Sequence, residues 1–272
     1  MEVVPGVHSI PGGKVSFMGL SAPNVYLVVG KEGALIDSGY GDKASVGSML
    51  DYVKKFDGLR LAYILITHAH PDHIGGASRI KEATEAAIVL HSRDASRCDG
   101  VLADKVVEDG NTLAVDSVSL EVIHTPGHSP GHVCILLKEE GILFSGDHVL
   151  GLGTTAMRPP EGDMAQYIDS LRKLLEYDIQ LICPGHGPPI RAPRRKLEEL
   201  IQHRLEREQQ VLSRLQAGRA TIEELVHDIY PELDSRLYQA AEGQVLAHLT
   251  KLEREGKVAS LGSEADAGYS IK

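Results

Sequence analysis

The chain has 272 residues, of which 42% are hydrophobic and 4% aromatic, and its formal net charge is −10 at pH 7. This length suits one large domain or one domain with a small appendage. Most of the excess acid lies before residue 191, which argues against broad electrostatic binding of nucleic acid. No apolar run approaches the roughly 20 residues of a membrane helix, and the start "MEVVPGVHSIPGG" does not resemble a signal peptide, so we expect a cytoplasmic protein with no membrane partner.

Strand-like and helix-like segments alternate through the first 190 residues. Strands are predicted over residues 24–30, 33–39, 61–67, 87–91, 112–125, 132–139, 141–147 and 179–185. Helices are predicted over residues 42–56, 76–86 and 163–177. Strands and helices interleaved in this way predict an α/β domain with helices covering the sheet faces, in one sheet or in two.

The pattern changes at the proline-rich stretch "PGHGPPIRAPRRK". Helices are predicted over residues 195–218, 221–230 and 236–256, the second of them with a capping box formed by Thr221 and Glu224. Two β-prone pieces follow within residues 257–272, around a turn rich in Gly and Asp. Three helices and a hairpin outline a winged helix, so we expect a catalytic domain over residues 1–191 and a winged-helix domain over 192–272.

The cysteines are three in number and far apart: Cys98, Cys134 and Cys183. No C-x-x-C pair suggests a thiolate metal site or a redox dithiol. Cys134 and Cys183 lie in apolar runs, so we expect small buried residues and not nucleophiles.

Polar side chains follow four apolar strands at the point where each is predicted to end. The stretches are "THAHPDH" after "LAYILI", "HTPGHSPGH" after "LEVI", "SGDH" after "GILF" and "PGHG" after "IQLIC". Functional groups of α/β folds gather at the carboxyl ends of strands. The four stretches could therefore converge on one point.

The residue types in these stretches are those of a metal site, since imidazole and carboxylate suit Zn, Mn or Fe. His68 and His70 can face one side of an extended segment, and Asp72 and His73 must then face another, so one short segment can serve two metals. His128, Asp147 and His186 are available to complete both coordination spheres. Without a cation, three imidazoles and a carboxylate within six residues would cost desolvation and like-charge repulsion. "PGHG" alone would be a turn with an incidental histidine.

The stretch "T-H-A-H-P-D-H" resembles the H-x-H-x-D-H signature of the metallo-β-lactamase superfamily, and the other three stretches resemble its later motifs in the same order. The resemblance implies an αββα sandwich with the metals at one edge between two sheets. It implies two zinc ions, with iron or manganese as alternatives. One ion would be held by His68, His70 and His128, the other by Asp72, His73 and His186, and Asp147 would bridge them. Asp37 resembles a residue that supports the site from behind the ligands.

A dinuclear site of this kind activates water for hydrolysis. Asp72 could orient the nucleophile or carry its proton, and His132 or His148 could act from just outside the ligands. For the two histidines, hydrogen bonding without proton transfer is an equal alternative.

The tail "LAHLTKLEREGKV" and the loop "GDHVLGLGTT" resemble the winged-helix group of lactamase-β-like protein two, which includes an endoribonuclease acting on single-stranded RNA. The first functional hypothesis is therefore a zinc-dependent endoribonuclease. The alternative is an acyl hydrolase for thioesters or lactones, like the hydroxyacylglutathione hydrolases. A non-catalytic binding module is a third hypothesis, which the intact ligand set opposes. Flavodiiron chemistry is discounted because it normally requires a carboxylate within the first motif, where this sequence has a histidine. No oligomeric state is predicted.

Overall fold

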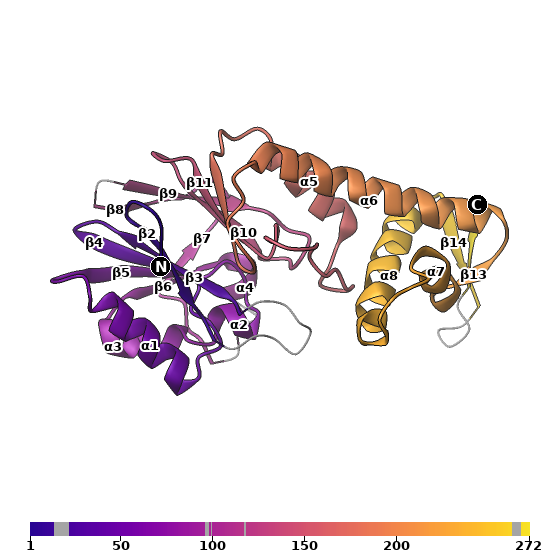
Figure 1. Ribbon diagram of the computed structural model, residues 1–272. Coiled ribbons are helices and arrows are strands. Elements are labelled where there is room, and N and C mark those ends of the chain that lie inside the picture. The colour runs from indigo at the N-terminus through magenta and orange to yellow at the C-terminus, as the bar shows by residue number, and fades with distance from the viewer. Residues whose placement is uncertain (14–21, 96–97, 99, 117, 263–267) are drawn as a thin grey trace. The chain divides into compact units, whose positions relative to one another are not determined.

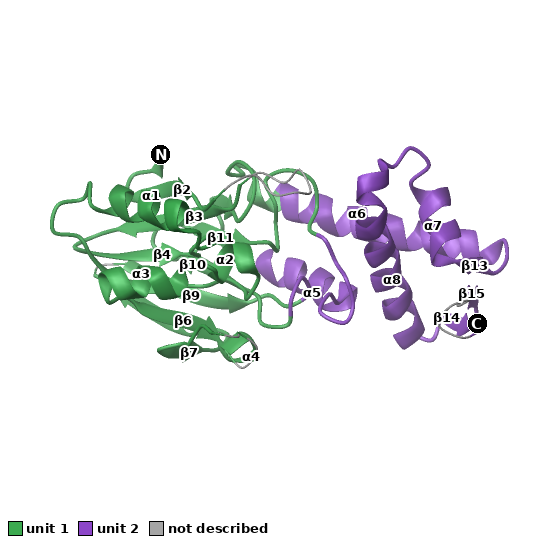
Figure 2. Ribbon diagram, turned by 90° about the horizontal axis from the view of Figure 1, so that it is seen from below, with its two compact units in different colours: residues 1–126, 130–155, 177–194 green, residues 127–129, 156–176, 195–272 purple. Residues whose placement is uncertain are grey.

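The computed structural model describes residues 1–13, 22–95, 98, 100–116, 118–262 and 268–272. These residues form two compact units, coloured separately in Figure 2. Unit 1 comprises residues 1–126, 130–155 and 177–194, and unit 2 comprises residues 127–129, 156–176 and 195–272. Two segments that precede the predicted boundary near residue 192 therefore belong with the C-terminal residues.

Unit 1 is built on two sheets (Figure 1). The larger sheet has seven strands whose spatial order follows the chain: β1 (Glu2–Val4), β2 (Val7–Pro11), β3 (Asn24–Val29), β4 (Glu32–Ile36), β5 (Arg60–Leu65), β6 (Ala87–His91) and β7 (Lys105–Val107). The smaller sheet has five strands, in the order β12 (Leu181–Pro184), β11 (Ile142–Gly146), β10 (Val133–Leu137), β9 (Val118–His124) and β8 (Thr112–Val115). Strands β4 to β7 pair in parallel, as do β11 and β12, and the other pairs are antiparallel.

The main core of unit 1 joins the two sheets. Val28 and Ile36 of the larger sheet belong to the same buried cluster as Val122 and Ile135 of the smaller one. Each fully buried aliphatic side chain of this kind contributes about 1.5–3 kcal/mol relative to exposure. Alternation along the strands therefore fixes which face of each sheet turns inward.

The opposite face of the larger sheet is covered by α1 (Lys43–Val53) and α3 (Ala77–Thr84), which lie together in Figure 1. Met49 of α1 and Ile80 of α3 pack with Leu35 and Ile64 of the sheet. Two short helices, α2 (Pro71–Ile74) and α4 (Ser92–Ala95), follow β5 and β6. Helices thus cover a sheet face, as the alternating pattern predicted.

The predicted strand over residues 112–125 is two strands, β8 and β9. Asp116, between them, has a φ of +53°, a left-handed conformation that Asp tolerates better than most residues. Residue 117 lies outside the described residues. The prediction missed this reversal because only Asp116 and Ser117 stand between two runs rich in apolar and β-branched residues.

Unit 2 contains α5 (Met164–Leu174), α6 (Pro193–Gln216, from Arg195 on) and a winged helix. The latter comprises β13 (Ala220–Thr221), α7 (Ile222–Ile229), a 3₁₀ turn (Ser235–Leu237), α8 (Tyr238–Arg254), β14 (Val258–Leu261) and β15 (Gly268–Ile271). The capping box of Thr221 and Glu224 is confirmed, with bonds of 2.8 and 3.2 Å. The turn predicted between the last two strands lies partly outside the described residues, at 263–267.

No helix within the described ranges is long and apolar enough to span a membrane.

Candidate metal centre

The four polar stretches follow four strands, as predicted. Residues 68–73 come after β5, His128 after β9, Asp147 after β11 and His186 after β12. Within unit 1 the structure brings together side chains from three of these strand ends. They form two groups whose possible ligand atoms lie within 4.8 Å of one another: His68, His73 and Asp147, and Asp72, His73 and His186.

The second group is centred on the Asp72 carboxylate. His186 Nε2 lies 3.2 Å from Asp72 Oδ2 and 3.6 Å from Asp147 Oδ1. His73 Nε2 lies 3.8 Å from Asp72 Oδ2 and 3.4 Å from Asp147 Oδ1. Burial by itself would raise the pKa of Asp72, but His186 and His73 lower it below its usual value. Asp72 is therefore an ionised carboxylate at neutral pH.

The orientation of His73 is set by Asp37. His73 Nδ1 lies 2.7 Å from Asp37 Oδ2, and Asp37 also accepts hydrogen bonds from the backbone N–H and the hydroxyl of Thr67, at 2.8 and 3.0 Å. The ring therefore donates from Nδ1 and turns Nε2 toward Asp72 and Asp147. Asp37 itself adopts a φ of +65°.

His73 Nε2 provides a test of whether the residues fit a metal ion. This atom is buried and, among the described residues, has no hydrogen-bond partner. Burial alone would lower the pKa of His73, yet the carboxylates of Asp37 and Asp147 raise it well above its usual value. A buried lone pair facing two carboxylates is a position that a proton or a cation must fill. The donor set of imidazole nitrogens and carboxylate oxygens fits a divalent transition metal.

His68 and His70 lie side by side on the other part of the motif. His68 Nε2 is 2.9 Å from His70 Nδ1, and His68 Nδ1 is 3.1 Å from Thr67 Oγ1. The backbone between them is fixed by Asp94 of α4, whose Oδ2 accepts from the N–H of Ala69 at 2.9 Å. The two pairs were expected to face different directions, but the ring centroids of His68 and His73 lie 4.2 Å apart. The reason is that the chain turns into α2 at Pro71 and does not stay extended.

The other candidate ligand is His128. It lies in the loop 127–129, which belongs to unit 2. His128 Nδ1 is 3.0 Å from the carbonyl oxygen of Ala156. Since a carbonyl oxygen only accepts, Nδ1 is the nitrogen that carries the proton in this bond.

His132 and His148 are both fully buried. His132 Nε2 accepts a hydrogen bond from the backbone N–H of Asp147 at 3.2 Å, and its Nδ1 lies 3.0 Å from Thr125 Oγ1. The Thr125 hydroxyl in turn donates to Cys134 Sγ at 3.3 Å. Both ring nitrogens of His132 therefore take part in hydrogen bonds, one of them to the turn that carries Asp147. Of the two roles considered for His132, this arrangement favours hydrogen bonding over proton transfer.

Two glycines of the first motif are required by close contacts. The φ values of Gly75 and Gly76, −57° and −86°, are available to any residue, so the backbone conformation does not require glycine at either position. A Cβ on Gly75 would lie 2.5 Å from the carbonyl oxygen of Tyr40, and one on Gly76 would lie 2.2 Å from that of Ser38. Their small size thus lets the Asp37 loop pack against the metal motif.

Sequence reasoning missed three residues that position these loops. Asn24 Nδ2 donates to the carbonyls of Pro184 and Gly187, at 3.0 and 2.8 Å, and so anchors the "PGHG" turn. Tyr26 donates to the same Pro184 carbonyl at 2.9 Å. Nothing in the sequence marks these three hydrogen bonds of Asn24 and Tyr26, because each joins residues far apart in the chain. Asp94 follows a strand as the candidate ligands do, and that signal could have identified it.

Cys134 and Cys183 are buried, as predicted, and Cys98 is half-buried. Burial raises the pKa of the Cys183 thiol to about 12. It is therefore a protonated core side chain.

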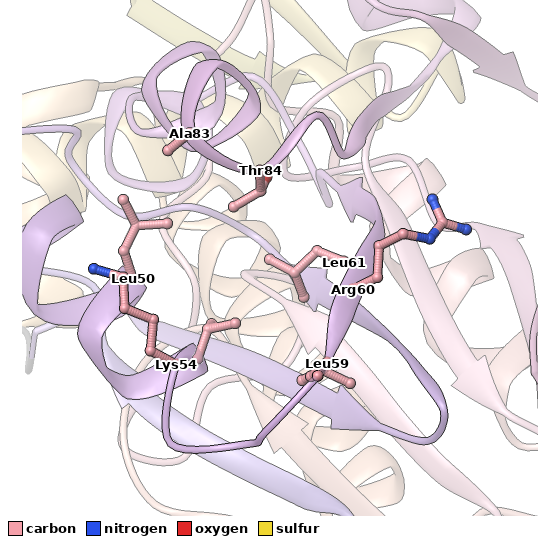
Figure 3. Close-up of a pocket in the computed structure, with 9 residues that line it drawn as sticks. Leu50, Lys54, Leu59, Arg60, Leu61, Ala83 and Thr84 are labelled. Carbon is pink, nitrogen blue, oxygen red and sulfur yellow. The ribbon is translucent and has the colours of Figure 1, made fainter.

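A hollow of about 580 Å³ lies elsewhere on unit 1, at the start of β5 (Figure 3). Its lining includes Leu50, Leu59, Leu61 and Thr84. Residues 68–73 follow the other end of β5, and none of the candidate ligands lines this hollow. It therefore has no share in the chemistry of the metal centre.

Two facing sheets carry His and Asp side chains where their strands end, an arrangement that fits the class of metal-dependent hydrolases. The chain matches the family model of the metallo-beta-lactamase superfamily over residues 18–186 and that of the beta-lactamase associated winged helix domain over residues 221–267. The chain belongs to the metallo-beta-lactamase superfamily.

Similar proteins include a beta-lactamase-like protein 2 homolog of Drosophila melanogaster, 32% identical over 100% of this chain and 98% of its own. Another homolog of that name, from Caenorhabditis elegans, is 33% identical over 88% of this chain and 81% of its own. An atrochrysone carboxyl ACP thioesterase of Aspergillus fumigatus is 33% identical over 84% of this chain and 75% of its own. Among solved structures, a metallo-beta-lactamase family protein of Thermus thermophilus has a TM-score of 0.81 and 26% identity, covering 100% of both chains. The predicted fold, with its winged-helix tail, is confirmed.

Proposed function

We propose that the protein is a dinuclear metal-dependent hydrolase whose substrate is a small acyl thioester. The observation that carries the metal-dependent part is the buried Nε2 of His73, which faces the carboxylates of Asp72 and Asp147. The thioester part is supported by the relative named a thioesterase. A cytoplasmic location stays a prediction.

Seven side chains would hold the metals. His68, His70 and His128 would bind one cation, Asp72, His73 and His186 the second, and Asp147 would lie between them. We propose zinc, the usual metal for this donor set, with iron or manganese as alternatives. When bound, such cations lower the pKa of a coordinated water and polarise the substrate oxygen.

The remaining work falls to the chain's own residues. Asp72 is ionised at neutral pH, so its carboxylate can accept the proton of the attacking water. Asp37 holds His73, and His132 holds the Asp147 turn, so that the site is formed before the substrate arrives.

The leaving group favours a thioester over a phosphodiester. A thiol has a pKa of about 8.5, so a thiolate leaves without a proton donor, whereas an alkoxide needs one. The two histidines considered as donors, His132 and His148, are fully buried. Hydrolysis of a thioester does not require proton donation from either histidine. The net charge of −10 also disfavours a polyanionic substrate.

Cleavage of single-stranded RNA is the second candidate. It is favoured by the winged-helix tail and by the resemblance of that tail to a group containing an endoribonuclease. The same metal centre would serve it, because a Lewis-acid site does not itself choose between C–S and P–O bonds.

One zinc-loaded preparation should be assayed with a panel of acyl thioesters and with single-stranded RNA. We expect thiol release from at least one thioester, and background rates in Asp72→Ala and His73→Ala variants. Site-dependent cleavage of RNA without thioester hydrolysis would replace the first candidate by the second. RNA cleavage that persists in both variants would indicate a contaminating nuclease.

A further inference from the structure

Helix α8 of unit 2 is buried on two opposite faces. Ala241, Val245, Leu249 and Leu252 enter the core of the winged helix. At 100° per residue, Gly243, Ala247 and Arg254 lie on the opposite side of the helix, and the first two of these are also buried. In winged helices that bind nucleic acid, the corresponding helix needs one free face.

The second face of α8 contacts the segment that leads into α5. A Cβ on Gly243 would lie 2.9 Å from the carbonyl oxygen of Met157, so the helix and this segment approach as closely as glycine allows. Eleven residues further along α8, Arg254 donates to Asp163 Oδ2. Asp163 is also the N-cap of α5, where it accepts from the backbone N–H groups of Ala165 and Gln166.

The same segment holds the loop that carries His128. The Ala156 carbonyl accepts from His128 Nδ1 at 3.0 Å. The backbone N–H of Asp163 donates to the carbonyl of Gly127 at 2.8 Å. Gly127 has a φ of +138°, and a Cβ there would lie 2.4 Å from Cα of Tyr167 in α5. Both ends of the segment 156–163 therefore fix the histidine loop.

We propose that the winged helix acts as a positioning device for the metal centre, with Arg254 as its positioning residue. Arg254 holds Asp163, Asp163 and Ala156 hold the loop 127–129, and this loop carries His128. This role rests on the proposed metal site. It gives the C-terminal unit a function that requires no nucleic acid.

The test is zinc affinity, measured by competition with a chromophoric chelator, together with zinc content per chain. We expect Arg254→Ala to weaken binding of one zinc by about tenfold, the size of effect usual for residues that orient a metal ligand. Arg254→Lys keeps the charge and should restore most of the affinity. Gly243→Ala, which pushes the segment from α8, should weaken the same zinc.

Arg172→Ala is the matched control. Among the described residues, Arg172 forms an ion pair with the exposed Asp169 on the surface of α5, at 3.1 Å. Its replacement should therefore leave zinc affinity unchanged. Because the Arg254 side chain is 62% exposed, its removal should leave the thermal unfolding of the metal-free protein nearly unchanged. A loss of zinc that merely follows global destabilisation would contradict the proposal.

His128→Ala separates this inference from the proposed function. If His128→Ala leaves zinc affinity unchanged, the proposed metal site is wrong. If it weakens zinc binding while Arg254→Ala and Gly243→Ala do not, only the positioning role is wrong. Equal loss in Arg254→Lys and Arg254→Ala would refute the ion pair with Asp163 as the cause.

Discussion

The carboxylate of Asp37 and the imidazole of His73 form a buried pair, with Oδ2 and Nδ1 2.7 Å apart. The two residues come from different loops, one after β4 and the other after β5. The pair fixes which nitrogen of His73 faces the other candidate ligands. Asp37, which is not among the candidate ligands, thus determines the orientation of His73, which is one of them.

Asp37→Ala should weaken zinc binding by about 10- to 100-fold, because the ring of His73 loses the acceptor that sets its tautomer. The measurement is metal content after dialysis against a weak chelator. Asp51→Asn is the control, since Asp51 is exposed on α1 and pairs only with Lys54 in the contacts described. Unchanged zinc content in Asp37→Ala would show that His73 does not depend on this pair.

Gly185→Ala should disrupt the metal centre more than the fold. The added Cβ would lie 2.7 Å from Asp147 Oδ1 and 2.8 Å from His73 Cε1. The same Cβ would lie 2.9 Å from the backbone carbonyl carbon of Gly146. We therefore expect loss of zinc and of hydrolysis, with a smaller fall in the thermal midpoint of the metal-free protein. Gly47→Ala is the matched control, because a Cβ there meets nothing within 4 Å and alanine favours a helix by about 0.5–1 kcal/mol. An active Gly185→Ala enzyme with full zinc content would contradict this close approach.

His132→Gln distinguishes the two roles considered for His132. If the residue positions the Asp147 turn through its hydrogen bond of 3.2 Å, zinc content should fall and the shape of the pH–rate profile should stay the same. If it transfers a proton, one limb of the pH profile should disappear while zinc content is retained. We expect the first result, since Nδ1 is also engaged by Thr125.

Glu208 should stabilise unit 2 in a pH-dependent way. Burial by itself raises its pKa, but the His248 and Lys251 side chains lower it to about 2, from an ordinary value of 4.5. Lys251 Nζ lies 2.7 Å from Glu208 Oε2. Because the folded-state pKa is the lower one, the stabilisation is fully present above pH 4.5 and is lost as the pH falls toward 2.

Glu208→Gln should therefore lower the free energy of unfolding by roughly 2–3 kcal/mol at pH 7. The difference from the wild type should shrink between pH 4.5 and about 2, as measured by urea unfolding of metal-free protein. Glu199→Gln, which removes an exposed pair with Lys196, should have little effect at any pH. A difference independent of pH would mean that the Glu208 charge is not the source of the stability.

The strands and the positions of the candidate ligands could be predicted because both are local properties. Apolar runs such as "LAYILI" give β5 and "GILF" gives β11. The polar residues directly after them must lie at strand ends, whatever the rest of the fold. The capping box at Thr221 is local in the same sense.

Other contacts could not be predicted, because they join residues that are far apart in the sequence. Asn24 anchors a turn at Pro184, and Gly185 leaves room for His73 and Asp147. The sequence also could not show that α8 is buried on both faces, or that the segment before α5 belongs with the C-terminal unit. In a helix such as α8, the spacing of large apolar residues reveals one buried face clearly. A second face made of Gly and Ala, which packs against the backbone of another segment, gives little signal in the sequence.

By itself, then, the sequence determined the superfamily, the two sets of candidate ligands and the winged-helix outline, since these depend on residue type, spacing and strand order. Tertiary structure alone decided how the candidate ligands are oriented. Asp37 contacts His73, His132 contacts the Asp147 turn and the Ala156 carbonyl contacts His128. The physical reason is that an imidazole can present either nitrogen, and only the hydrogen-bond partner that folding brings to one nitrogen leaves the other to bind.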